Sequence, residues 1–220
     1  MIYLLWPTAR PQMFLEAHKA WVQKADNPSE IFTKVCVDDE SDINSLRPFE
    51  VIINATKRKG VTSAAYTLTK DLEVNDSDII ILASDDFVPP ESYDTWIKKQ
   101  LSHYNGTLIV RDGHQTGGCI TIPIMNGKCF KTLNRIIYHP SYYHLYSDAE
   151  LYNNLDQLQM LKDLRSEEYP LFEHKHWANG KRQVDEIDVY CTGNMHHDYK
   201  NYETRMQMSL NDRLKVDVFE

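Results

Sequence analysis

The residues of this chain best suited to chemistry are pairs of carboxylates that follow apolar segments. The clearest pair is Asp85-Asp86, which follows the apolar run 79–83 and Ser84 and precedes Pro89-Pro90. Adjacent carboxylates at the carboxyl end of a strand suit a hard divalent cation, which prefers oxygen ligands and is readily shared with substrate phosphates. The alternative interpretation is a solvated turn whose carboxylates accept hydrogen bonds from loop amides.

A second acidic pair, Asp38-Asp39, follows the apolar run 35–37. A carboxylate in this position can accept a hydrogen bond from the imide N–H of a uracil ring. A surface acidic loop explains the same residues, and both interpretations stay open at this stage.

Residues 146–151 combine a predicted helix start with two further acids. Ser147 and Glu150 have the spacing of a capping box, in which side chains satisfy the free backbone N–H groups of the first turn. That leaves Asp148, at a position where the helix dipole favours an ionised carboxylate. A charged carboxylate on a rigid helix start is well placed to act as a general base, so Asp148 is the predicted catalytic residue.

Two histidines separated by one residue, His174 and His176, lie in the segment EHKHWANGK at 173–181. In an extended or looped segment such a pair can supply metal ligands. A single histidine more often has a purely structural role, and this alternative stays open. The run His196-His197-Asp198 has a similar composition, and we interpret it as a surface loop.

In their order and spacing these motifs resemble the GT-A glycosyltransferases, most closely the family 2 type, over roughly residues 1–190. In such enzymes the first strand runs into a loop like 7–10 (PTAR), and the second ends in a DD-x-S motif, here 38–41. The other family motifs fall on three segments: the DxD motif on 84–86, the base-bearing helix on 147–148, and the EH-x-H-x(3)-GK stretch of bacterial and phage relatives on 173–181.

The resemblance implies that the donor is a nucleotide-sugar, with a UDP-sugar as the expected one. Thr8 and Asp39 would contact the base of the nucleotide, and Asp85 its ribose. Apart from the resemblance, the basic run 57–59, Arg58 in particular, offers positive charge for the diphosphate, although a solvated turn before Gly60 explains it equally well.

The resemblance also implies a divalent cation, Mn²⁺ or Mg²⁺, and a reaction that inverts the anomeric configuration. Asp86 would hold the cation that bridges the two phosphates. His176, with His174 as the weaker choice, would complete the protein ligands. Asp148 would deprotonate the acceptor hydroxyl, which then attacks the anomeric carbon opposite the leaving diphosphate.

Two departures from the family pattern affect the donor site. Ser84 stands where the DxD motif usually has its first acid, so either Asp85 takes over ribose binding or the metal is held weakly. The Arg-Asn pair that commonly follows the third strand is absent from 64–67, where the sequence is AAYT.

A layered α/β fold would bring these motifs together. Strands alternating with helices indicate a mostly parallel sheet flanked by helices, and such sheets bind ligands beyond the carboxyl ends of their strands. We therefore predict a single compact Rossmann-like domain, which the resemblance narrows to the GT-A type. The expected buried strands are Ile2–Trp6, Phe32–Val37, Glu50–Asn54 and Asp78–Ala83, and the expected amphipathic helices are Phe14–Ala25 and Val61–Leu72.

After residue 105 the alternation weakens. Residues 1–105 would form the nucleotide-sugar-binding half, and 106–220 the acceptor and catalytic half, of one domain over 1–220. In the second half we expect strands over Thr107–Val110 and Gly118–Pro123, a helix over Ser147–Leu164, an irregular segment over 165–198, and a final helix over Tyr199–Leu214.

The composition is that of an ordinary globular protein, with 42% hydrophobic and 25% charged residues. A net charge of −8 without a basic tail gives no general attraction to nucleic acid or to an anionic membrane. The four cysteines have no metal-binding or CxxC spacing, and the apolar run 2–6 is too short to cross a membrane. We therefore expect a reduced protein without a membrane anchor in the cytoplasm, or in the host cytoplasm if it is phage-encoded.

Two other classes of protein compete with this interpretation. A nucleotidyltransferase also combines an α/β sheet with carboxylate-held magnesium, but it should have a glycine-rich loop after the first strand, and residues 6–10 contain no glycine. A non-catalytic nucleotide-sugar-binding module is the second. The presence of both Asp86 and Asp148 argues against it, because a degenerate copy should often have lost one.

The acceptor hydroxyl has two candidate sources: a glycan, or a hydroxymethylated base of phage DNA. An enzyme that acts on DNA needs only a local cationic groove lined with aromatic side chains. The sequence offers basic and aromatic residues for such a groove, namely 57–59, Lys181, Arg182, Tyr142, Tyr143, Tyr146 and Trp177.

Overall fold

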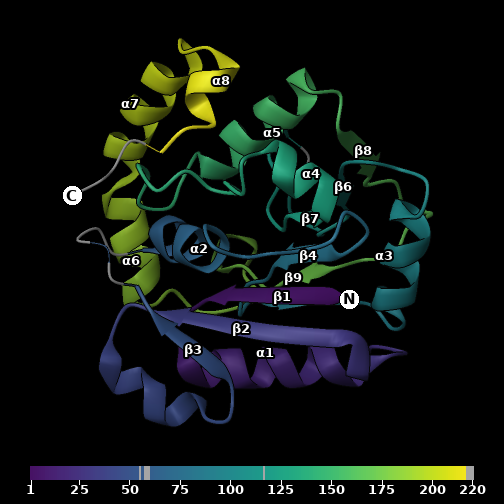
Figure 1. The fold of residues 1–220 in the computed structure, drawn as a ribbon. Helices are drawn as coiled ribbons and strands as arrows, with labels where there is room; N and C mark the ends of the chain where they lie inside the picture. Colours follow the sequence, from purple (N-terminus) through teal and green to yellow (C-terminus); the bar gives the residue numbers. More distant parts are fainter. Residues whose placement is uncertain (55, 57–59, 116, 217–220) are drawn as a thin grey trace.

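The computed structural model describes residues 1–54, 56, 60–115 and 117–216. A seven-stranded sheet in the order β3-β2-β1-β4-β7-β6-β8 forms its centre (Figure 1). The four strands of the first half all run parallel: β1 (Ile2–Pro7), β2 (Ile31–Val37), β3 (Glu50–Ile53) and β4 (Ile79–Leu82). This part of the sheet matches the four strands expected from the sequence.

The second half of the chain adds three shorter strands. β7 (Ile124–Asn126) is antiparallel to β4 and to β6 (Thr107–Val110), and β8 (Leu161–Leu164) is parallel to β6. Two successive antiparallel pairings restore the original direction. The carboxyl ends of β1, β2, β4 and β6 therefore lie at one edge, and the predicted mostly parallel sheet is confirmed.

Helices cover both faces of the sheet, which explains why the central strands are apolar almost throughout. In β1, Ile2, Leu4 and Trp6 join the core on one face, and Leu5 joins the core on the other. The first face is covered by α1 (Pro11–Gln23) and α3 (Tyr93–Leu101), and the second by α2 (Val61–Thr69), α4 (Gly127–Thr132) and α5 (Ser147–Gln157) (Figure 1).

Three helices complete the chain beside α2 and α5: α6 (Glu186–Gly193), α7 (Met195–Met206) and α8 (Leu210–Arg213) (Figure 1). A buried ion pair fastens α7 to α5, with Arg205 Nε 2.7 Å from Glu150 Oε2. The fully buried carboxylate of Asp198 accepts hydrogen bonds from the backbone N–H groups of residues 143–145. These contacts fix the loop that leads into α5.

Several expectations for the second half were wrong. Residues 118–123 form bends, and the strand comes just after them. The helix that begins at Ser147 ends at Gln157, where Gln159 with φ 56° turns the chain back into β8. That strand reads LKDL and lies at the sheet edge, so its charges hide the alternation that marks a buried strand.

The later segments also differ from expectation. Residues 165–198 include the short strand β9 (Glu173–His174) and α6, and the final helix is divided into α7 and α8. His196-His197-Asp198 lies in α7 instead of a surface loop, and Asp198 is buried because it caps the N–H groups described above.

The predicted capping box at Ser147 is also wrong. Tyr146 is the residue before α5, and it makes no side-chain cap. Ser147 Oγ donates to His144 O at 2.8 Å, and Glu150 pairs with Arg205 instead of the helix start.

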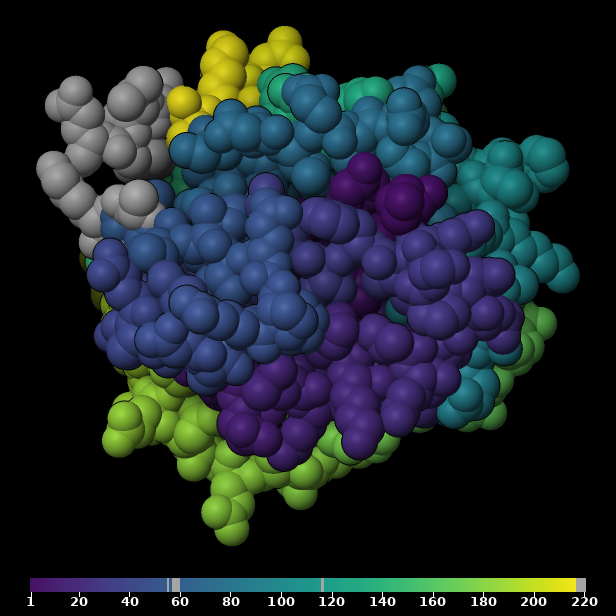
Figure 2. All heavy atoms as spheres, turned by 60° about the horizontal axis from the view of Figure 1, so that its bottom comes forward, coloured from purple at the N-terminus to yellow at the C-terminus, as the bar shows by residue number. Residues whose placement is uncertain are grey.

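Figure 2 shows the face of the molecule on which α1 lies. Purple and dark-blue atoms of the first strands and α1 cover its centre, and yellow-green atoms from late in the chain lie along its lower edge. The early and late parts of the chain thus pack together in one domain. All four cysteines are free. Among the described residues, no helix is both long enough and apolar enough to cross a bilayer.

Candidate functional site

A cleft of about 230 Å³ lies at the carboxyl edge of the sheet, and both halves of the chain contribute to its walls. It is rich in titratable side chains, which is unusual for a space enclosed by apolar strands. Those with an acid, a base or an imidazole are Arg10, Asp86, His114, His144, Asp148, His174, His176, Arg182 and Asp188.

The two acids that follow β4 differ in their environments. Asp86 accepts hydrogen bonds from Ser84 Oγ at 2.6 Å and from His174 Nε2 at 3.2 Å. Burial disfavours its charge, but these two donors hold the pKa of Asp86 at about 2. For Asp85, burial raises the pKa to about 6, against the effect of Arg10, whose Nη1 lies 3.5 Å from Asp85 Oδ1. Asp86 is thus the permanently ionised member of the pair.

A two-stranded ladder places His174 beside Asp86. β9 pairs antiparallel with β5 (Phe87–Val88), so His174 lies opposite Phe87 and stacks on its ring with centroids 4.1 Å apart. His174 Nδ1 lies 3.7 Å from Asp112 Oδ2 on the other side. Burial opposes a charge on His174, but the carboxylates of Asp112 and Asp86 raise its pKa. The ring therefore donates a hydrogen bond to Asp86, and Asp112 acts on it through its charge.

His176 has the opposite character. Burial and the neighbouring His174 lower the pKa of His176 to about 4, so its imidazole is neutral near pH 7. Its Nδ1 accepts the Ala178 N–H at 3.1 Å, and its ring stacks on His114 with centroids 5.2 Å apart. A neutral imidazole is the form that binds metals.

These side chains suit a divalent cation that arrives with its phosphate ligands. The described residues contain no group of three or more His, Cys, Asp or Glu side chains arranged to hold a metal by themselves. The ionised Asp86 and the neutral His176 line the same cleft and have the right donor chemistry. Mg²⁺ in particular is usually bound by one or two carboxylates together with substrate phosphates.

Asp148 lies in the same cleft, in the first turn of α5. Its carboxylate accepts the Ala149 N–H at 2.9 Å and a hydrogen bond from the Cys119 thiol. Burial raises the pKa of Asp148, and no cation among the described residues pairs with it. A carboxylate with a raised pKa and no counter-ion is a stronger base than an ordinary aspartate.

The structure places the predicted base-binding residues at the ends of the first two strands. Thr8 is buried after β1, and its hydroxyl donates to Asp85 Oδ2 at 3.3 Å. Asp39 is exposed after β2, where it accepts the Ser41 N–H at 2.8 Å as the cap of the 3₁₀ helix η2 (Glu40–Leu46). Arg58, like the rest of 57–59, lies outside the described residues.

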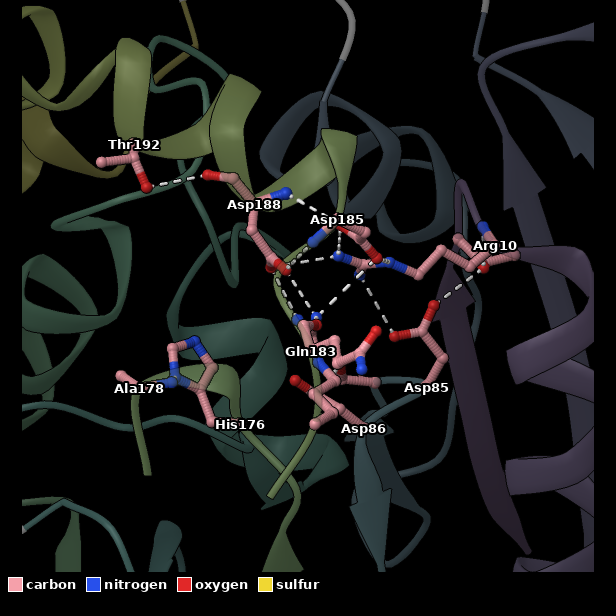
Figure 3. Close-up of polar contacts among 12 residues, drawn as sticks. Arg10, Asp85, Asp86, His176, Ala178, Gln183, Asp185, Asp188 and Thr192 are labelled. Carbon is pink, nitrogen blue, oxygen red and sulfur yellow. Dashed lines mark hydrogen bonds and ion pairs between the residues drawn. The ribbon is translucent and has the colours of Figure 1, made fainter. Parts of the chain in front are cut away.

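A network of arginines and aspartates beside Asp85 was not predicted from the sequence. Figure 3 shows Arg10 reaching from the loop after β1 toward Asp85, Asp185 and Asp188. Arg10 Nε lies 2.6 Å from Asp185 Oδ2, and Arg182 Nη1 lies 2.5 Å from Asp188 Oδ2. This network joins α6 to the acids that follow β4.

One local signal for this network was available. Asp185 and Asp188 form a capping box at the start of α6, with each side chain accepting the other's backbone N–H at 3.0 Å. The spacing of these two acids is a recognisable helix start. Nothing in the sequence predicted that Arg10, 175 residues earlier, would pair with them.

No family model matched this chain, and no curated protein matched it in sequence. Comparison with solved structures does find similar folds. TarS from S. aureus, residues 1–349 in complex with UDP, is 13% identical with a TM-score of 0.58, covering 96% of this chain and 76% of that one. The same TarS segment was also solved in complex with UDP-GlcNAc.

Two further structures share the fold. The mannosyltransferase PcManGT from Pyrobaculum calidifontis, in complex with GDP-Man and Mn²⁺, is 11% identical with a TM-score of 0.56, over 89% of this chain and 69% of that one. A 4-diphosphocytidyl-2C-methyl-D-erythritol synthase from Anaerococcus prevotii is 12% identical with a TM-score of 0.51, over 89% and 98%. The chain therefore has a GT-A-like α/β fold.

Proposed function

We propose that this protein is an inverting glycosyltransferase that transfers a sugar from a UDP-sugar to an acceptor hydroxyl. The observation that carries the proposal is the presence in one cleft of two carboxylates with different properties. Asp86 is ionised and hydrogen-bonded at the end of β4, whereas Asp148 has a raised pKa and no counter-ion. One suits the binding of a charged donor, and the other suits proton removal.

In the proposed reaction the acceptor oxygen forms a bond to the anomeric carbon while the bond from that carbon to the diphosphate oxygen breaks. Asp148 takes the proton of the acceptor hydroxyl, and the bonding electrons leave with UDP. Attack from the face opposite the diphosphate inverts the anomeric configuration. Displacement in a single step requires only one such base, and general-base catalysis typically contributes 10²–10⁴-fold.

The first half of the chain would hold the donor, and the second half would supply the acceptor side and the base. Thr8 and Asp39 follow β1 and β2, and we assign them to the nucleotide base, with Asp85 at the ribose. Ligands bind beyond the carboxyl ends of strands in open α/β sheets, where these residues lie. The solved complexes of proteins with this fold, TarS with UDP and PcManGT with GDP-Man, support a nucleotide-sugar as donor.

We assign Asp86 and His176 as the protein ligands of a divalent cation, with His174 as the weaker candidate. Bound there with the donor, Mn²⁺ or Mg²⁺ would neutralise negative charge on the diphosphate. The crystallised combination of GDP-Man and Mn²⁺ in PcManGT supports the presence of a divalent cation. His174 is the weaker candidate because it already donates to Asp86 and its pKa is raised.

Of the two expected acceptors, the site favours a glycan hydroxyl over a hydroxymethylated DNA base. The described basic residues offered for a DNA groove are engaged elsewhere: Lys181 Nζ lies 2.9 Å from Glu173 Oε1, and Arg182 lines the cleft itself, where it contacts Asp188. A DNA backbone would need free cations at the mouth of the cleft. A neutral saccharide would not.

The proposal is tested by incubating the protein with UDP-sugars, Mn²⁺ and either saccharides or hydroxymethylated DNA, and by measuring UDP release and product mass. Transfer to saccharides with inversion is the expected result. Transfer only to DNA would replace the acceptor assignment. Formation of UDP-sugar from UTP and a sugar 1-phosphate would instead establish a nucleotidyltransferase. Binding of UDP-sugars without any transfer would establish a non-catalytic module.

A further inference from the structure

Two guanidinium groups converge on one carboxylate at the mouth of the cleft. Arg10 Nη2 lies 3.1 Å from Asp188 Oδ1, and the two terminal nitrogens of Arg182 lie 2.5 and 2.6 Å from the Asp188 oxygens. The side chain of Asp188 is 7% exposed, so it is enclosed by the two arginines. Asp188 therefore sits in a bidentate cationic clamp.

The geometry of this clamp suits phosphate as well as carboxylate. A planar guanidinium presents parallel N–H donors that match either group. Arg182 also has a donor to spare, because its Nε is buried and has no hydrogen-bond partner among the described residues. A larger anion than one carboxylate would use that donor.

The acidic side chains of the cleft make cations necessary for binding a diphosphate there. A nucleoside diphosphate entering beside Asp85 and Asp86 is repelled by both acids when they are ionised. Arg10 and Arg182 are the only permanent cations among the described residues that line the cleft. Both are neutralised by Asp185 and Asp188 as the protein stands.

The acids come from a largely exposed segment of the chain. Of the eight residues of α6, only Asp188 is buried, and Val189 and Tyr190 are 63% and 44% exposed. Figure 3 shows that the contacts between α6 and the acids after β4 pass through Arg10. If these ion pairs are exchanged for others, the first turn of α6 is free to move.

We propose that Arg10 and Arg182 form the diphosphate subsite, and that Asp188 occupies this subsite until a donor displaces it together with the first turn of α6. This inference rests on the proposed function for the identity of the ligand. In addition, the Asp188 carboxylate competes with the diphosphate of the donor for the two arginines. Donor binding and release of α6 are then two sides of one equilibrium, so each changes the other by the same factor.

The test measures UDP affinity by titration calorimetry in the presence of Mg²⁺. In Asp188→Asn the side chain keeps its shape and an oxygen for the helix cap but loses its charge, so UDP should bind about tenfold more tightly. Arg182→Gln should bind UDP at least about tenfold more weakly. Arg135→Gln is the matched control, because Arg135 pairs with Glu73 on the surface away from the cleft.

Opposite changes in UDP affinity, tighter in Asp188→Asn and weaker in Arg182→Gln, distinguish the clamp from a structural role of these residues. If Asp188→Asn weakens UDP binding as Arg182→Gln does, Asp188 does not compete with the donor and the inference is wrong. Inorganic pyrophosphate serves as a second probe. If pyrophosphate binds more tightly to Asp188→Asn and more weakly to Arg182→Gln while UDP does not bind, the diphosphate subsite is supported and the assignment of UDP as donor is wrong. If neither anion binds, the subsite is overturned.

Hydrogen exchange in the unmodified protein gives a measurement that needs no variant. With saturating UDP, the amides of Asp188 and Val189, which now bond to Asp185, should exchange faster. Unchanged or slower exchange at these amides would show that α6 stays in place, and would contradict the inference.

Discussion

Asp86 and Asp148 show how the environment gives two carboxylates in one cleft different chemistry. Asp86 is surrounded by donors, so its charge is stabilised in spite of burial. Burial dominates at Asp148 and raises its pKa, against the backbone N–H groups at the start of α5 and the Cys119 thiol, which donate to its carboxylate. A group that binds cations should hold its charge at all working pH values, whereas a general base should be able to take up a proton.

At this scale the base assignment predicts the effect of Asp148→Asn. The amide keeps the size of the side chain but has no lone pair basic enough to accept the acceptor proton. Turnover should fall by roughly 10²–10⁴-fold while the affinity for UDP stays within about twofold of the parent. Steady-state kinetics and UDP titration check the two parts. Asp156→Asn is the control, because Asp156 is an exposed residue of the same helix. Full activity in Asp148→Asn would remove this residue from the mechanism.

The raised pKa of Asp148 also predicts the pH dependence of turnover. Only the deprotonated carboxylate acts as a base, so kcat should fall as the pH drops through the pKa of Asp148. Because burial raises that pKa, the acid limb should lie above the ordinary aspartate value of about 3.9.

Cys119 provides the check on this pH dependence. Burial raises the pKa of its thiol to about 12, so it stays a donor to Asp148 across the working range. Replacing it in Cys119→Ala removes a hydrogen bond that lowers the pKa of Asp148, and the acid limb should move further up. A limb that moves down, or one at or below pH 4, would mean that a different group controls turnover.

The sequence located single residues better than it located their partners. Asp85, Asp86 and Asp148 stand out because each follows a strand or starts a helix, and the two histidines stand out because one residue separates them. These are local properties. The pairing of Arg10 with Asp185 depends on where two segments 175 residues apart come to lie. A pattern of neighbours in sequence holds no such information, and these contacts of Arg10 could be identified only in the folded structure.

At the scale of elements, the same division between local and long-range features explains which predictions failed. β1, β4 and the carboxyl half of β2 are apolar runs buried on both faces, so their composition identifies them. β8 and β9 are short and carry Lys, Asp, Glu and His, and they are strands because of the partners they pair with. Pairing of that kind overrides local preference.

Asp94, whose carboxylate joins two elements of the fold, gives a prediction about stability. Asp94, at the start of α3, is fully buried and accepts the backbone N–H groups of Asp26 and Asn27 at 2.8 and 2.9 Å. These bonds join α3 to the loop after α1. Asp94→Asn leaves one oxygen to serve both donors, so the free energy of unfolding at pH 7 should fall by about 1.5–3 kcal/mol. Urea denaturation measures this difference.

The pH dependence of that difference is a further check. Burial disfavours the charge of Asp94, but the backbone hydrogen bonds lower its pKa below the ordinary value in the folded protein. A carboxylate with a lowered folded-state pKa contributes stability that is fully present above the unfolded pKa of about 3.9 and is lost as the pH falls through the folded value. The parent and Asp94→Asn should therefore converge in stability below about pH 4. A gap that persists in acid would contradict the charge-based explanation.

At the scale of the whole molecule, a single sheet joins the first half of the chain to the second, and residues of both halves line the cleft. A ligand that contacts both sides binds only the folded chain, so its binding energy adds to the free energy of unfolding. The size of this effect reports on the ligand, because a nucleotide that fits the site stabilises the fold more than one that does not. The melting temperature is therefore a readout of donor identity.

We predict that UDP with Mn²⁺, at about 100 times its dissociation constant, stabilises the protein by about 2.7 kcal/mol. For a chain of this length that corresponds to a rise in melting temperature of roughly 5–10 °C. GDP, CDP and ADP at the same concentration should give smaller rises, because Asp39 and Thr8 are assigned to a uracil ring.

Asp86→Asn should abolish most of the dependence of the melting temperature on Mn²⁺, whereas Asp76→Asn, at an exposed surface pair with Lys131, should not. Equal shifts for all four nucleotides would leave the diphosphate site intact but rule out recognition of the base, and no shift with any of them would remove the donor site from this cleft.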